Sequence, residues 1–191
     1  MSRQRLLTSD AVIDAAAELL DTEGAMSLSL SRVARQLEVK PPSLYNHVDG
    51  LVGLRRGVAL RVSEDVGKHV GAAVMGRSGR DALLAAAHAL RGYAQEHPAL
   101  YEFLAQIRVD DEDFATASLQ ALEPILAVLR GFDLGEADVI HAARTLRATL
   151  HGFVAIESAG GFGLDIDVDA SFDWMIENLA NTFEAASEGR G

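Results

Sequence analysis

The chain has 191 residues, 49% of them hydrophobic, and a formal net charge of −11. The absence of cysteine excludes disulfides, thiolate metal sites and a cysteine nucleophile. No apolar run reaches transmembrane length and the first residues are too polar for a secretory signal, so we expect a cytoplasmic protein without a membrane partner.

The negative charge is concentrated in the later part of the chain. Residues 1–68 carry nine basic and nine acidic side chains, whereas the remaining residues carry eight and nineteen. Because salt screens charges beyond about 8–10 Å, an acidic body need not cancel the field of a basic surface on the first part. The sequence therefore predicts a near-neutral or locally basic head on an acidic body.

The head is predicted to consist of three helices. The first begins at Thr8 or Ser9, either of which can cap it, and ends before Gly24. The second begins after Ser29 or Ser31, and its buried stripe is formed by Val33, Ala34 and Leu37.

The third piece, Pro42 to His47, is started by prolines that cannot continue the previous helix but suit the first turn of a new one. Leu44 and Val48 point inward at i and i+4. Lysine, hydroxyl, phenol, amide and imidazole groups are left outside, where they suit base edges and phosphates of a major groove. This pattern is typical of a helix-turn-helix. The candidate DNA contacts are its outward residues Lys40, Ser43, Tyr45, Asn46 and His47 and, at the start of the second helix, Ser29.

Further phosphate contacts are predicted on either side of this motif. Arg3 and Arg5 belong either to a frayed terminus or to an arm that reaches the adjacent groove. A long helix over residues 51–70 begins just after the motif, and its free N–H groups can hold a phosphate. Arg55 and Arg56, one turn into that helix, contact phosphate or are solvated charges.

The rest of the chain continues the helical pattern without strands or repeats. Breaks are expected at residues 71–79, and helices at 81–97, 98–107, 112–130 with a kink at Pro124, 136–158 and 170–186. We therefore predict an all-α fold with a helix-turn-helix head (1–50), a connecting helix (51–70) and a C-terminal helical domain (71–191).

The last two predicted helices have wide apolar faces. Such faces suggest a helix pair that packs against its own copy in a four-helix interface, although ordinary core gives the same pattern. Gly152 would let another backbone approach closely. The candidate dimer-interface residues are Ile140, Ala143, Leu150, Gly152, Phe172, Met175, Ile176, Leu179 and Phe183.

No motif predicts a metal, a cofactor or a catalytic group. The run Asp165, Asp167, Asp169 begins like a calcium loop, but Ala170 and Ile176 replace the required glycine and glutamate. The glycines at 160–163 lack the lysine and hydroxyl of a phosphate cradle. Histidine spacings do not place two ligands on one ion, although ligands combined across helices stay open.

Taken together, the chain resembles the TetR family of transcriptional regulators. The resemblance rests on residues 12–24 (VIDAAAELLDTEG), 28–39 and 42–48 (PSLYNHV), ahead of a long helix. Residues 146–163 (LRATLHGFVAIESAGGFG) are similar to an effector-domain subgroup with an HG pair in its penultimate helix. The resemblance implies a homodimeric, usually repressive, DNA-binding protein with a small-molecule pocket in each C-terminal domain, and not an enzyme.

By position, the resemblance assigns the recognition helix and the turn before it to Lys40, Pro41, Ser43, Tyr45, Asn46 and His47. Many family members begin the fourth helix with a lysine, where this chain has Leu51. Backbone N–H groups or Arg55 would then supply that phosphate contact.

The effector is expected to be a small, largely apolar ligand. Aromatic or polar residues within otherwise aliphatic helices are the pocket candidates: Tyr93, Phe103, Phe114 and His151. Two alternatives stay open, namely a ligand-binding helical protein without DNA-binding activity and a helical enzyme that uses Asp and His groups.

Overall fold

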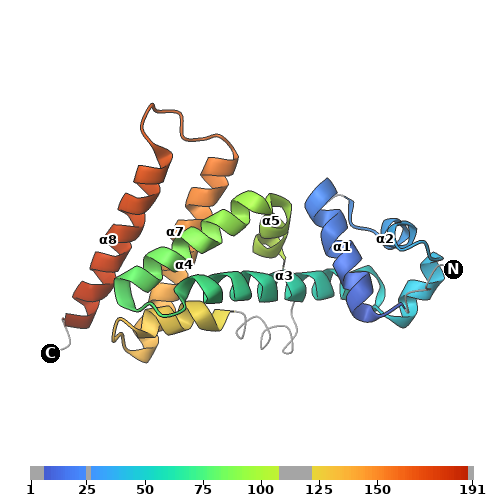
Figure 1. The fold of residues 1–191 in the computed structure, drawn as a ribbon, viewed down its shortest axis with the longest axis horizontal. Helices are drawn as coiled ribbons and strands as arrows, with labels where there is room; N and C mark the ends of the chain where they lie inside the picture. Colours follow the sequence, from blue (N-terminus) through green and yellow to red (C-terminus); the bar gives the residue numbers. More distant parts are fainter. Residues whose placement is uncertain (1–6, 25–26, 108–121, 189–191) are drawn as a thin grey trace. The chain divides into compact units, whose positions relative to one another are not determined.

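The computed structural model describes residues 7–24, 27–107 and 122–188, and every regular element in these ranges is helical (Figure 1). Arg3, Arg5, Phe114 and most of the helix expected at 112–130 lie outside the described residues. The all-α fold class is confirmed. The elements in chain order are α1 (Ser9–Glu23), α2 (Leu30–Gln36), the 3-10 helix η2 (Pro41–Asn46), α3 (Gly50–Val74), α4 (Gly79–Glu96), α5 (Pro98–Gln106), a helical stretch at 122–130, α7 (Glu136–Ser158) and α8 (Val168–Glu188).

The described residues form two compact units whose division differs from the expected one. The first unit contains the chain up to Asp65 together with His97 to Ile107, and the second contains Val66 to Glu96 with residues 122–188. Helix α3 also continues past Gly71, where we expected a break. The chain turns instead at Gly76 and Gly79, whose φ angles of +73° and +53° suit glycine.

The first unit is held by one apolar face from each of its helices. Helix α1 begins where the Thr8 hydroxyl accepts a hydrogen bond from the Ala11 N–H (3.1 Å). Gly57 lets α3 approach α1 closely, since a Cβ there would lie 2.7 Å from Ile13 Cδ1 and Ile13 would have to shift. The largest fully buried side chains of this unit are Val12, Leu20, Val33, Leu44, Leu54, Val58 and Val62.

Helix α5 is part of the first unit, although it follows α4 in the chain. Leu100 and Phe103 are buried, and α5 packs against α1. His97, which precedes α5, pairs with Asp21 of α1 at 2.7 Å between Nδ1 and Oδ2. The contact shows that a segment far along the chain completes the head.

The second unit is a bundle of α4, α7 and α8 with the stretch at 122–130. Aromatic rings pack edge to face within it, with centroids 5.1 Å apart for Phe153 and Phe172 and 5.7 Å apart for Phe132 and Phe183. The largest fully buried side chains of the unit are Leu83, Leu129, Leu146, Phe172 and Ile176.

A buried arginine ties three helices of this unit together. Arg91 of α4 donates two hydrogen bonds to Glu157 of α7 and one of 2.7 Å to Asp169 of α8. Its guanidinium also lies 4.6 Å from the Phe172 ring centroid, a cation–π contact. The hydrogen bonds with Glu157 raise the pKa of Arg91 against the opposing effect of burial, so the side chain stays charged.

Candidate nucleic-acid interface

The candidate interface starts from α2 and the tight turn that follows it. The Ser29 hydroxyl accepts a hydrogen bond from the Arg32 N–H (3.4 Å), which confirms Ser29 as the cap. After α2 the chain turns at Glu38, whose φ angle of +57° lies in the left-handed region. The Val39 N–H donates to the Ala34 carbonyl at 2.9 Å and closes the turn.

The element after the turn is a 3-10 helix that begins one residue earlier than predicted. Pro41 and Pro42 occupy its first two positions, where their missing N–H groups cost no hydrogen bond. The i to i+3 bonds from Ser43 N–H to Lys40 carbonyl and from His47 N–H to Leu44 carbonyl are both 2.9 Å.

Burial fixes which side of η2 faces outward. Leu44 is fully buried and Val48 is 8% exposed, as their spacing predicted. The neighbouring Tyr45 is 63% exposed. The structure brings the predicted DNA-contact residues of this region onto one short element: Lys40, Pro41, Tyr45 and Asn46 are exposed, and Ser43 and His47 are half-buried.

The first turn of α3 can contribute backbone N–H groups, but no charged side chain, to the candidate interface. It contains no acidic residue, and it begins at Gly50, whose φ angle is +60°. The Gly50 and Gly53 N–H groups donate to the Val48 and Asp49 carbonyls (both 2.9 Å), and the Asp49 carboxylate stands immediately before the helix. A phosphate contact by the remaining N–H groups stays a prediction. Leu51 and Val52 are exposed there (41% and 80%).

Arg55 has a partner that the sequence did not predict. Its guanidinium lies 5.1 Å from the centroid of the Phe103 ring, within the first unit. A cation–π contact of this kind holds the side chain against α5. This contact weakens the expectation that Arg55 replaces the missing lysine at position 51.

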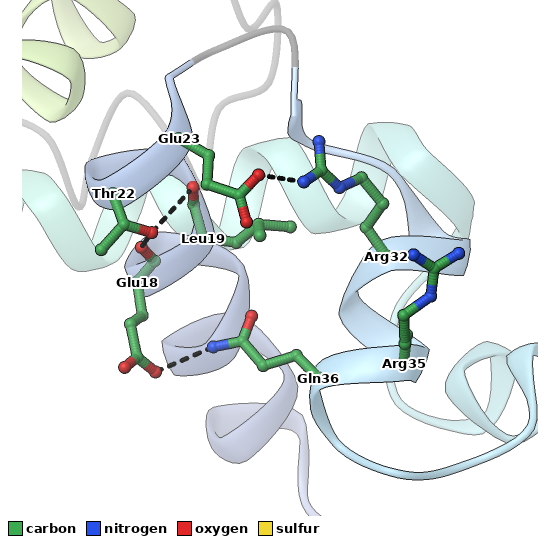
Figure 2. A pocket seen from close by; sticks show the side chains of 7 residues that line it. All are labelled: Glu18, Leu19, Thr22, Glu23, Arg32, Arg35 and Gln36. Carbon is green, nitrogen blue, oxygen red and sulfur yellow. Dashed lines mark hydrogen bonds and ion pairs between the residues drawn. The ribbon is translucent and has the colours of Figure 1, made fainter.

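A small open cleft of about 280 Å³ lies between α1 and α2 (Figure 2). Its walls are joined by an ion pair between Glu23 and Arg32 and by a hydrogen bond of 2.9 Å from Gln36 to Glu18. These charged and polar groups do not suit an apolar effector. These groups hold α2 against α1. The sequence contains one indication of this contact, because Arg32 and Gln36 are four residues apart and therefore lie on the same face of α2.

The structure places the predicted effector residues in different units. Tyr93 is buried in the second unit, with its ring 6.0 Å from that of His69. Phe103 is buried in the first unit beside Arg55, and His151 is exposed on α7. Their role as effector contacts stays a prediction.

Burial also corrects part of the predicted dimer interface. Phe172 and Ile176 are 0% exposed, Leu150 is 3% exposed and Phe183 is 4% exposed. Side chains that are already buried in the protomer have almost no surface left for a partner, so these four belong to its core. The expectation remains for Ile140, which is exposed, and for the half-buried Ala143, Gly152, Met175 and Leu179.

Two other kinds of site were searched in the described residues. No group of three His, Asp or Glu side chains there is arranged to hold a metal ion. None of the described helices combines the length and the apolar character needed to cross a bilayer.

The comparisons with known proteins agree with a helix-turn-helix head and a helical second unit. Residues 83–179 match the family model of the tetracyclin repressor-like C-terminal domain. An uncharacterised HTH-type transcriptional regulator of Mycobacterium tuberculosis is 38% identical over 96% of this chain and 85% of its own length. A second such regulator, from Bacillus subtilis, is 34% identical over 94% of both chains.

A solved TetR regulator from Streptomyces coelicolor has the same fold, with a TM-score of 0.75 and 21% identity over 95% of this chain and 99% of its own. The chain belongs to the TetR family of transcriptional regulators. It is accordingly a regulator and not an enzyme.

Proposed function

We propose that the protein acts as a homodimeric repressor. Two copies place their η2 turns in successive major grooves of a pseudo-palindromic operator, with centres about 34–36 Å apart. A small, largely apolar ligand bound by the second unit favours a conformation that does not fit this spacing and releases the DNA. Such coupling between two sites is typically about 1–3 kcal/mol.

The observation that carries the proposal is the contrast between Leu44 and Tyr45. The two are adjacent, yet Leu44 is fully buried and Tyr45 is 63% exposed. A large aromatic side chain held outward by a packed leucine has a fixed position, and no described residue bonds the Tyr45 hydroxyl. A free phenol hydroxyl can donate to a phosphate oxygen, and such contacts set the register of a protein on the duplex.

The proposal is tested first by selecting bound sequences from random duplexes with the full chain. The expected result is an inverted repeat whose half-site centres are one helical turn apart. Recovery of no enriched sequence, or of a single unrepeated half-site, would contradict the proposed mode of binding.

The selected operator then permits a test of the residues. Tyr45→Ala is expected to weaken binding about tenfold or more, because a hydrogen bond to a charged group is worth about 1.5–3 kcal/mol. Tyr45→Phe should lose most of that affinity as well, since it removes only the hydroxyl. Met75→Ala, which shortens another exposed apolar side chain (80%) in the second unit, is the control and should bind normally.

Affinity is measured by gel shift at fixed salt, and helicity by circular dichroism. Unchanged affinity of Tyr45→Ala, with unchanged helicity, would reject η2 as the recognition element.

A further inference from the structure

The outer face of α7 carries a row of exposed residues that includes two arginines. Ile140 is followed at spacings of four, seven and eleven residues by Arg144, Arg147 and His151, and all four are exposed. Residues at these spacings share one side of an α-helix. From residue 139 to residue 155 the helix has no acidic side chain. The row, Ile140–Arg144–Arg147–His151, is therefore a basic surface on a strongly acidic protein.

The segment from residue 164 to residue 188 has the opposite character, with seven acidic residues and no basic one. Four of the seven are bound within the second unit. Arg91 holds Asp169 (2.7 Å), His88 holds Asp173 (2.8 Å), and Arg80 holds both Glu177 and Glu184.

The remaining charges are left over on both sides. The seventh acid, Glu188, is the last residue of α8. The Asp167 carboxylate accepts a hydrogen bond from the Asp169 N–H (2.9 Å) at the start of α8. Within the described part of the chain, no ion pair joins Arg144 or Arg147 to an acid, and none joins Asp165 or Asp167 to a base. All four side chains are exposed.

Large apolar side chains are exposed beside Asp165 and Asp167. Leu164 and Ile166, which flank Asp165, are 82% and 68% exposed, and Trp174 of α8 is 72% exposed. Several large apolar residues exposed within one short stretch are typical of a surface that a partner covers.

We propose that a second copy of this chain covers this surface by cross-pairing, with the α7 row of each copy against Asp165 and Asp167 of the other. This inference rests on the proposed homodimer and specifies its contacts. A two-fold axis repeats each such contact, so both copies contribute an α7 row and an acidic segment. Facing α7 rows would instead bring like charges together, which is unfavourable.

The position of Gly152 supports an antiparallel arrangement of the two α7 helices that cross at this residue. A Cβ placed there would have no atom within 4 Å, and its neighbours on that side of α7, Ala148 and Ala155, are small and exposed. Two antiparallel α7 helices can approach closely at such a point. With a rise of about 1.5 Å per residue, a crossing at Gly152 brings the residues after Ser158 of one copy alongside roughly residue 145 of the other, between the two arginines.

Two charge-reversed forms of the full chain test the proposal. In R144E/R147E the row becomes acidic, and in D165K/D167K the two unbridged acids become basic. Circular dichroism checks the helicity of each form, because Asp167→Lys also removes the hydrogen bond that the Asp167 carboxylate accepts from the Asp169 N–H. Each form alone should self-associate about tenfold or more weakly, because like charges meet twice at its interface. An equimolar mixture should recover dimers of nearly wild-type affinity, since every contact in the mixed dimer again joins opposite charges. Self-association is measured by sedimentation equilibrium.

Arg77→Glu reverses another exposed arginine of the second unit and should leave the dimer unchanged. The milder R144Q/R147Q form should weaken the dimer less and reduce its sensitivity to salt.

Each other outcome contradicts a specific part of the proposal. If R144E/R147E pairs with the wild-type chain rather than with D165K/D167K, the α7 rows face each other and cross-pairing is wrong. If both reversed forms dimerise normally with native helicity, this face is not the interface. A wild-type chain that stays monomeric would instead contradict the proposed homodimer itself.

Discussion

Glu38 shows how the helix-turn-helix is closed at the level of single residues. Its φ angle of +57° lies in the region that favours glycine, yet the turn is held by the bond from the Val39 N–H to the Ala34 carbonyl. A non-glycine residue in this region is strained by about 1 kcal/mol or more. The packing of α2 against η2 maintains this strained conformation.

We therefore expect Glu38→Gly to raise the free energy of unfolding by up to about 1 kcal/mol, because glycine removes the strain but also gains freedom in the unfolded chain. Urea unfolding followed by circular dichroism measures the change. Arg35→Gly, in ordinary helical geometry in α2, is the matched control and should lose about 1 kcal/mol. A loss of stability in Glu38→Gly would show that the glutamate side chain matters more than its backbone strain.

At the scale of elements, the second unit depends on one side chain that lies between helices. The side chain of Arg91 is 7% exposed and that of its partner Glu157 is 21% exposed. Burial of a charge is costly unless it is paired and hydrogen-bonded. The carboxylates and the aromatic rings around Arg91 meet these needs together, so α4, α7 and α8 are fixed at one point.

Arg91→Met is expected to lower the free energy of unfolding by about 3 kcal/mol, since it leaves a partly buried carboxylate without its partner. The free energy of unfolding of Arg91→Lys should lie between those of the wild type and Arg91→Met, because lysine keeps the charge but not the planar bidentate contact. The double variant R91M/E157Q should recover part of the loss in urea unfolding. If Arg91→Met is as stable as the exposed control Arg77→Met, the cluster does not hold the helices together.

At the scale of the whole molecule, the balance of charge bears on how DNA is held. The chain has a net charge of −11, so its overall field repels DNA and attraction must come from a few local groups. Binding should accordingly depend on the operator sequence, and nonspecific binding should be weak. Lys40 stands exposed immediately before η2 and is the clearest of these local cations.

Lys40→Ala is expected to reduce the slope of log affinity against log salt by about 2 for a dimer, because each neutralised phosphate contributes about 0.9. Gel-shift titrations at several salt concentrations give the slope. Lys68→Ala, which removes an exposed lysine from the second unit, should leave it unchanged. An unchanged slope in Lys40→Ala would place Lys40 away from the phosphates.

Local signals in the chain predict most of the helices and the outward face of η2, and they narrow each of the first two caps to two candidates. Thr8 and Ser29 cap the residues next to them, two prolines start η2, and the spacing of Leu44 and Val48 fixes which side is buried. Such signals act over a few residues, so they are visible in the chain.

What each buried face packs against became clear from the folded arrangement of the helices. The apolar pattern of α8 suited a dimer interface and a core equally well, and Phe172 and Ile176 proved to be core. Likewise the contact of Arg55 with Phe103 joins residues 48 positions apart, and Arg91 meets Glu157 and Asp169 from two further helices. An amphipathic pattern indicates that one face of a helix is buried. Which element packs on that face depends on contacts between segments that are distant in the chain.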